Sequence, residues 1–418
     1  MAEKYQDHRT LYEMIKGMEE PTIKAMAHWV GGILRTVDEG EPLVWNQFTF
    51  WCDSMIALDV QPIAPELWPA MARAVAPPPT PEEAAAAAAE NPILDAAQQA
   101  GIPAEVCAAG RYVVGAILLD MIPPPTMIVV PSYPCDNTKA LYQAVAELTG
   151  APLYLVDCPY WMDDEGEAME YWVKQYKGVI SFMEEHSGKK LDYDRLKEVA
   201  EESNRYMDCW LEAEELMKLK PLPQRGPFQS GEILTTLGLP LATEAIKARL
   251  DVLKAQVAGG ATAVPEEKIR VIWNYLPVLW YRELFDWMAT ELGAVIPTGM
   301  TSWYSFEPID TSTPESTIRG MARRALNGYM GKQGRGASDI WIEDSLNTFE
   351  QYKADCIIVN GALGCKWVRG SYGLLRDICR ERGIPIMMFD ADIADPRIVS
   401  ADEVRVRIED FLDTVVGR

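Results

Sequence analysis

The stretch DCIIVNGALGCKW, residues 355–367, decides the fold of this chain. Its apolar run at 357–359 predicts a buried strand that ends in a glycine-containing loop, and a helical pattern follows Cys365. A second apolar run at 384–389 predicts another strand. Strand, loop, helix and strand form a βαβ unit, which places Cys365 just past the carboxyl end of the first strand. Open α/β sheets bind their ligands at that end.

The same pattern occurs earlier in the chain. An apolar run at 127–130 leads through a proline-containing loop to Cys135, and a helical stretch and a second strand at 153–156 follow. Aligning the two apolar runs places Cys135 on Cys365. Two α/β halves that each offer a cysteine at the same place predict one metal ion or metal cluster held between two domains.

Length, composition and charge bound the class of protein. The chain has 418 residues, 48% of them hydrophobic and 24% charged, which predicts a soluble globular protein of two or three domains. A net charge of -23 argues against nucleic acid or an anionic membrane as partner. The polar N-terminus has no signal-peptide features and no apolar run reaches the length of a membrane span, so we expect a cytoplasmic protein with reduced thiols.

Several common functional motifs are missing from the sequence. The chain has only 3 histidines, none of them near the βαβ loops, which argues against a histidine-based catalytic triad or a mixed Cys/His zinc site. It contains no P-loop, and no G-x-G-x-x-G follows a predicted strand. If ATP or a dinucleotide takes part in the reaction, we expect another protein to bind it.

The order of the predicted elements divides the chain into three parts. We expect N-terminal helices and a first α/β domain over 1–165, a helical connecting segment over 166–262 and a second α/β domain over 263–418. The fold class is therefore α/β, with two parallel-sheet domains of the flavodoxin or Rossmann kind. The alanine-rich stretch 77–90 predicts a surface helix without chemistry, and the aromatic loop 299–306 lines either a pocket or an interface.

Two further residues lie near predicted helix starts. Asp53 follows the strand predicted at 43–45 and is either a helix cap or a general acid/base. Cys107 opens a helix, where the helix dipole favours the thiolate form that metals bind.

The cysteine-bearing segments resemble the D-component subunits of (R)-2-hydroxyacyl-CoA dehydratases and their relatives, the ATP-dependent benzoyl-CoA reductases. The resemblance is carried by Glu105-Val-Cys107-Ala-Ala-Gly-Arg111, by Cys135 after its strand, by Gly364-Cys365-Lys366 and by the closing run 383–397. It implies that Cys107, Cys135 and Cys365 bind a [4Fe-4S] cluster, which leaves one iron with a ligand other than cysteine.

The resemblance also implies a reaction and partners. One-electron reduction of an acyl-CoA thioester gives a ketyl radical anion that expels the 2-hydroxyl group, and the electron comes from a separate ATP-dependent iron–sulfur activator. The resemblance further implies a heterodimer with a homologous second subunit. The missing P-loop agrees with a separate activator.

Departures from the family pattern keep alternatives open. Serine positions of the dehydratases fall on Asn46 and Phe48, and a glutamate falls on Asp53. A benzoyl-CoA reductase subunit is therefore the first alternative, and an electron-transfer protein without acyl-CoA chemistry is the second. Cys52 and Cys158 are the candidates for a fourth cysteine ligand, and we expect the other cysteines, such as Cys379, to be buried packing residues.

Overall fold

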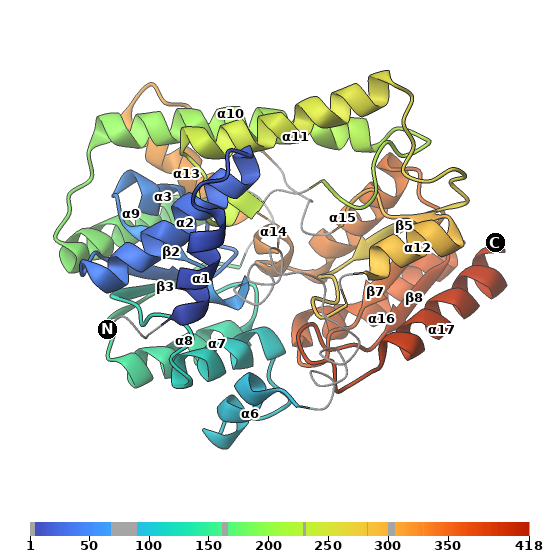
Figure 1. Cartoon of the computed structure of the whole chain (residues 1–418), viewed down its shortest axis with the longest axis horizontal. Coiled ribbons are helices and arrows are strands. Elements are labelled where there is room, and N and C mark those ends of the chain that lie inside the picture. Colours follow the sequence, from blue (N-terminus) through green and yellow to red (C-terminus); the bar gives the residue numbers. More distant parts are fainter. Residues whose placement is uncertain are drawn as a thin grey trace.

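Two parallel sheets form the framework of the molecule. The structure is a computed structural model that describes residues 5–67, 90–160, 166–228, 231–281, 283–299, 306–328 and 330–417. The first sheet has the strand order β2-β1-β3-β4 and the second has the order β6-β5-β7-β8, with all pairs parallel. They lie at the left and right of Figure 1. The predicted α/β class with two parallel-sheet domains is confirmed.

The central strands of both sheets are buried along their whole length. The strands are β1 (Leu43–Asn46), β2 (Gln61–Ile63), β3 (Met127–Pro131) and β4 (Leu153–Val156) in the first sheet, and β5 (Ile269–Asn274), β6 (Ala294–Val295), β7 (Cys356–Asn360) and β8 (Ile386–Phe389) in the second. All residues of β3 and β7 are buried, as expected for apolar strands whose sheet is covered on both faces. These are the two strands that precede Cys135 and Cys365.

The first sheet is flanked by helices that the local sequence starts and stops. They are α1 (Gln6–Ile15), α2 (Pro21–Asp38), α3 (Asp53–Ala57), the short 3₁₀ turn η1 (Pro65–Leu67), α6 (Pro92–Gln99), α7 (Ala108–Leu118) and α8 (Asp136–Thr149). Helix α2 starts with Pro21, and the Glu20 carboxylate accepts a hydrogen bond from the Ile23 amide. Helix α8 stops at Gly150, whose φ of 71° is a left-handed conformation that favours glycine.

Helices connect the two halves along the chain. They are α9 (Glu167–Ser187), α10 (Tyr193–Met217), η2 (Gly231–Leu234) and α11 (Pro240–Ala258). Helices α10 and α11 run along the top of Figure 1 from the first half towards the second. Their inward faces bury large side chains such as Tyr206, Trp210 and Leu250 in one apolar core with residues of both domains.

The second half carries α12 (Leu284–Leu292), α13 (Pro314–Asn327), α14 (Gly331–Gly334), α15 (Ser338–Gln351), α16 (Lys366–Glu381), α17 (Ala401–Phe411) and η4 (Leu412–Val416). Helix α13 packs on the first half, because Trp172 Nε1 donates to the Ala322 carbonyl (2.8 Å) and the Tyr133 hydroxyl donates to the Ala325 carbonyl (3.0 Å). The exact domain limits at 165 and 262 stay a prediction.

The strand order determines where each sheet can bind a ligand. In both sheets the first strand in sequence (β1 or β5) lies beside the third (β3 or β7). The chain connections that leave these two strands run towards opposite edges of the sheet. Parallel sheets bind ligands beyond the carboxyl ends of such a strand pair. Except for residues 90, 299 and 306, the stretches 77–90 and 299–306 lie outside the described residues.

Candidate functional site

Three cysteines each stand directly before a helix. Cys107 is the N-cap residue of α7, Cys135 that of α8 and Cys365 that of α16. The exposed amide groups and the dipole at a helix N-terminus lower the free energy of a thiolate there. Cys135 and Cys365 also follow the equivalent strands β3 and β7, so the predicted equivalence of their positions is present in the fold.

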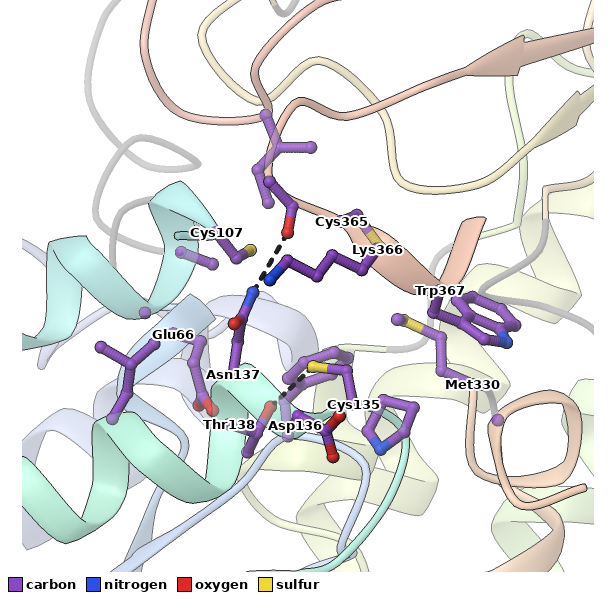
Figure 2. Close-up of a pocket in the computed structure, with 18 of the residues that line it drawn as sticks. Glu66, Cys107, Cys135, Asp136, Asn137, Thr138, Met330, Cys365, Lys366 and Trp367 are labelled. Carbon is purple, nitrogen blue, oxygen red and sulfur yellow. Dashed lines mark hydrogen bonds between the residues drawn. The ribbon is translucent and has the colours of Figure 1, made fainter. Parts of the chain in front are cut away.

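The three thiols line a single cavity of about 450 Å³ between the two α/β domains. Figure 2 shows Cys107 at the upper left, Cys365 to its right and Cys135 below them. Cys365 is buried, whereas Cys107 and Cys135 are half-buried. Residues far apart in the sequence therefore meet at one cavity.

The thiols are close enough to influence one another electrostatically. Burial raises the pKa of the Cys107 thiol well above its usual range, and the neighbouring Cys365 and Cys135 raise it further. Burial also raises the pKa of Cys365. Three thiolates in one buried cavity repel one another, and this repulsion raises the free energy of the folded protein unless a cation lies between them. A bound metal centre would supply that positive charge, and the thiol donor set fits one.

The arrangement of the three thiols indicates which kind of metal centre they could bind. Within the part of the chain that the structure describes, no three His, Cys, Asp or Glu side chains are grouped as the ligands of one metal ion. In a cubane cluster each cysteine binds a different iron, so its thiols surround a larger centre. Three thiols that line one cavity could therefore serve as the cysteine ligands of an iron–sulfur cluster.

Tyr275 is a further polar residue of the cavity. It follows β5, lines the cavity and is 3% exposed. Burial and the neighbouring Cys365 thiol raise the pKa of the phenol well above its usual range, and the phenol in turn opposes the rise in the pKa of Cys365. Its φ of 115° is strained for a residue other than glycine, and such strain is concentrated at functional sites.

Glu66 places a buried carboxyl group at the same cavity. It lies in η1 just after β2, is 6% exposed, and its Oε2 atom has no hydrogen-bond partner. Burial raises the pKa of Glu66 to about 7, against the opposing effect of a hydrogen bond with Tyr142. A carboxyl group with this pKa can both donate and accept a proton near neutral pH.

The rest of the cavity wall is mainly apolar. Lys366 contributes an amino group, and the other carboxyl group of the wall, Asp136, is exposed and pairs with Lys139 at 2.9 Å. The apolar part of the wall comes from both domains and includes Phe48, Val113, Leu141, Leu276, Met330, Trp367 and Ile393. A cavity of this composition suits an organic ligand with few charges.

Comparison with known proteins agrees with the geometry of the site. The family model described as 2-hydroxyglutaryl-CoA dehydratase, D-component, matches residues 57–415, which is most of the chain.

The chain belongs to this family.

Alignments with individual relatives cover most of the chain. It is 24% identical over 403 residues to the (R)-phenyllactyl-CoA dehydratase alpha subunit of Clostridium sporogenes, covering 92% of each chain. It is 25% identical over 302 residues to the alpha subunit of (R)-2-hydroxyglutaryl-CoA dehydratase of Acidaminococcus fermentans, covering 70% of this chain and 61% of the relative. It is also 23% identical over 344 residues to a benzoyl-CoA reductase subunit of Thauera aromatica, covering 76% of this chain and 78% of the relative.

These comparisons confirm the family resemblance and the dehydratase type of enzyme that the sequence predicts. Among the described residues, none of the helices is both long enough and apolar enough to cross a membrane.

Asp53 of this D-component lies away from the cysteine cavity. It begins α3, is 1% exposed, and its Oδ1 atom accepts a hydrogen bond from the Ser54 amide at 2.9 Å. Burial raises the pKa of Asp53 to about 6, and the nearby Arg324 guanidinium opposes this rise. Asp53 is not among the residues that line the cavity. Its catalytic role stays a prediction.

The two candidates for a fourth cysteine ligand also lie outside the cavity wall. Cys52 is buried in the apolar core, where its thiol donates to the Ile233 carbonyl at 3.3 Å. Cys158 follows β4, and its amide donates to Ser132 Oγ at 2.8 Å. The cavity therefore offers three thiols and, on the described residues that line it, no fourth.

The sequence analysis missed Tyr275 and the role of Glu66. Both residues follow a strand closely, Tyr275 at once and Glu66 after a short link, much as the cysteines do. Examining the residues that follow every predicted strand would have found both.

Proposed function

We propose that this D-component holds a [4Fe-4S] cluster through Cys107, Cys135 and Cys365 and removes water from an (R)-2-hydroxyacyl-CoA. The observation that carries the proposal is the convergence of three helix N-cap cysteines from two domains on one cavity. The names of its dehydratase relatives support the reaction class.

The residues around the cavity have distinct tasks in this proposal. A bound cluster with one iron free of cysteine supplies an electron and a site for a substrate oxygen. The N-termini of α7, α8 and α16 stabilise the three thiolates. Tyr275 donates a hydrogen bond to the Cys365 sulfur and so tunes the charge on that ligand.

Glu66 is the acid/base group that the geometry favours. Loss of the 2-hydroxyl group from the substrate is easier when a proton reaches the leaving oxygen, and the proton must come from a group that is protonated near neutral pH. Glu66 lines the cavity, has a free Oε2 atom and has a pKa of about 7. Asp136 is exposed to solvent, and its pKa is lowered by Lys139, so it is a poorer proton donor.

The proposal includes two protein partners and explains the apolar wall. A homologous second subunit is expected because the relatives are themselves named as single subunits of their enzymes. An ATP-dependent iron–sulfur activator is expected because the sequence has no P-loop of its own. The apolar part of the wall would take the acyl chain, and the thioester would face the thiols.

A benzoyl-CoA reductase subunit is the second candidate. It is favoured by the similarity to the subunit of that enzyme from Thauera aromatica. It is also favoured by Phe48, an apolar side chain of the cavity wall. The dehydratases that this chain resembles tend to have serine at this position. An electron-transfer protein without acyl-CoA chemistry is the third candidate, and it does not explain the apolar cavity beside the thiols.

The deciding experiment is iron and sulfide analysis of the anaerobically purified protein, with EPR of the reduced protein with and without acyl-CoA compounds. About four irons per chain and a spectrum that changes with acyl-CoA support the proposal. Release of water from a 2-hydroxyacyl-CoA with catalytic amounts of ATP and reductant identifies a dehydratase. Stoichiometric use of both with ring reduction identifies a reductase. A signal that ignores acyl-CoA identifies an electron-transfer protein.

A further inference from the structure

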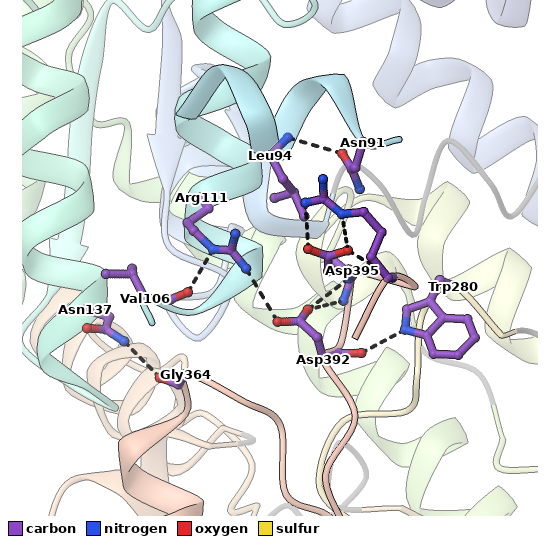
Figure 3. A network of polar contacts seen from close by, with 11 residues as sticks. Asn91, Leu94, Val106, Arg111, Asn137, Trp280, Gly364, Asp392 and Asp395 are labelled. Atoms are coloured by element: carbon purple, nitrogen blue, oxygen red, sulfur yellow. Dashed lines mark hydrogen bonds and ion pairs between the residues drawn. The ribbon is translucent and has the colours of Figure 1, made fainter. Parts of the chain in front are cut away.

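The three cysteine segments contact one another through groups other than their thiols. Asn137, two residues after Cys135, donates from Nδ2 to the carbonyl oxygen of Gly364 at 3.1 Å. Gly364 directly precedes Cys365 in the other domain. The hydrogen bond therefore joins the Cys135 and Cys365 segments across the domain interface (Figure 3).

Arg111 makes a second link across the same interface. It lies one helical turn after Cys107 and is 2% exposed. Its Nε donates to the Val106 carbonyl at 2.9 Å, just before Cys107, and its Nη2 lies 3.6 Å from Oδ2 of Asp392 (Figure 3). Both charged side chains of this pair are nearly fully buried, so removal of either partner leaves a buried charge unpaired.

Asp392 is itself held firmly in the second domain. Its Oδ1 accepts hydrogen bonds from the amides of Ala394 (2.8 Å) and Asp395 (2.9 Å), and Trp280 Nε1 donates to its carbonyl at 2.8 Å. It follows β8, which pairs with β7, the strand before Cys365. The Arg111 link therefore connects the Cys107 segment to the strand pair that carries Cys365.

We propose that Arg111 and Asn137 are positioning residues that fix the spacing of the three cysteines across the domain interface before any cluster binds. The two side chains make different contacts, one with Asp392 and one with Gly364, and each contacts the chain within two residues of a cysteine. Neither residue is proposed to touch the substrate. The inference rests on the proposed function only for the identity of the group that the thiols bind. The spacing of the cysteines is a property of the metal-free chain.

The first measurement uses the cluster-loaded protein. An iron chelator removes iron through states in which the domains have moved apart, so the rate of cluster loss reports how often they separate. Asn137→Ala should lose its cluster about five-fold faster than the wild type, the factor that corresponds to about 1 kcal/mol for one hydrogen bond. Arg111→Lys, which keeps the charge but loses the hydrogen bond with Val106, should also lose it faster, and the double variant faster than either.

A matched control is Asp95→Asn. Asp95 pairs with Arg397 at 2.6 Å across the same two domains, but the side chains are 41% and 25% exposed, and Arg397 also pairs with Asp395. This variant should lose its cluster at the wild-type rate. If it matched Asn137→Ala, the domain interface as a whole, and not the cysteine spacing, would govern cluster retention, and the proposal would be overturned.

A second measurement works without iron. In the metal-free protein, iodoacetamide should alkylate the buried Cys365 faster when the interface opens more often, and peptide mass spectrometry follows each cysteine separately. Asn137→Ala should raise the rate at Cys365 about five-fold and leave buried Cys379, in the same helix, unchanged. Equal rates at Cys365 in variant and wild type overturn the inference. Absence of iron from the wild type contradicts the proposed function alone, because the alkylation rates still decide the inference.

Discussion

Gly364 and Cys107 meet backbone to backbone across the two α/β domains. A Cβ atom added to Gly364 would lie 2.9 Å from the amide nitrogen of Cys107 and 3.0 Å from its Cα. Gly364 also has a φ of 81°, which L side chains rarely adopt. A backbone contact cannot be relieved by rotating a side chain, so this position sets how closely the segments of two cysteines approach.

Gly364→Ala should therefore force the Cys107 and Cys365 segments apart. We expect much lower iron and sulfide content after anaerobic loading, with destabilisation of roughly 1–3 kcal/mol from the strained backbone and the overpacking. Gly370→Ala, in helix α16 just after Cys365, is the matched control, because its added Cβ meets nothing within 4 Å. That variant should load iron normally and gain up to about 1 kcal/mol. Normal loading of Gly364→Ala would contradict the tight contact.

Each of the three proposed ligands should be required for iron binding. Cys107→Ala, Cys135→Ala and Cys365→Ala should each lose cluster iron in anaerobic iron and sulfide analysis, because each removes one of three thiolates. Cys209→Ala and Cys379→Ala should retain it, since neither thiol lines the cavity. Full iron and sulfide in Cys365→Ala would refute the proposed ligand set.

Tyr275→Phe should change the cluster without removing it. The variant lacks only the hydroxyl group near the Cys365 sulfur, and hydrogen bonds to the sulfur ligands raise the reduction potential of a cluster. We expect unchanged iron content and a more negative potential in an anaerobic redox titration followed by EPR. An unchanged potential would mean that the phenol does not donate to the sulfur.

Glu66→Gln should impair catalysis and alter its pH dependence. If Glu66 donates a proton, the wild-type rate should fall as the pH rises through about 7, because the carboxyl group is then deprotonated. Glutamine cannot donate such a proton, so we expect a loss of roughly 10²–10⁴-fold in kcat, and the fall in rate near this pH should disappear. Iron content serves as the control and should stay at the wild-type level.

Glu66→Gln, which should impair catalysis, should increase the stability of the folded protein at high pH. Burial raises the pKa of Glu66 from an ordinary 4.5 to about 7, so the folded state binds the proton more tightly than the unfolded state. The stability that this bound proton contributes is fully present below the pKa of Glu66 in the unfolded state. It is lost as the pH rises through the pKa of Glu66 in the folded state. Glu66→Gln should therefore match the wild type at about pH 4 and exceed it by up to about 3 kcal/mol at about pH 8. Urea unfolding at both pH values measures the difference.

Local patterns made much of the fold predictable. The apolar runs that became β3 and β7 are continuous and bounded by turn residues, and the helices after them stop at glycines. Because both strands have equivalent places in their sheets, the cysteines that follow them could be placed at one site without knowing any tertiary contact.

Contacts between distant segments could not be predicted in this way. No local pattern shows that Arg111 pairs with Asp392, or that Asp53 turns towards Arg324 and not towards the cysteines. Those orientations depend on how α3 and α7 pack against later parts of the chain. Glu66 is similar, because the Tyr142 side chain and the Phe48 backbone that affect its pKa through hydrogen bonds belong to distant parts of the chain.

The identical strand order of the two sheets gives the site an internal pseudo-symmetry. Cys135 and Cys365 are equivalent positions, since each follows the third strand of its sheet. Cys107 caps α7, the helix before β3, and its counterpart in the second half is the residue that caps α15, the helix before β7. That residue is Ala337, which has no ligating atom in its side chain. Ala337 is also not among the residues that line the cavity, so Cys107 has no counterpart there. Under the proposed function the ligand set is therefore asymmetric, with two thiols from the first domain and one from the second.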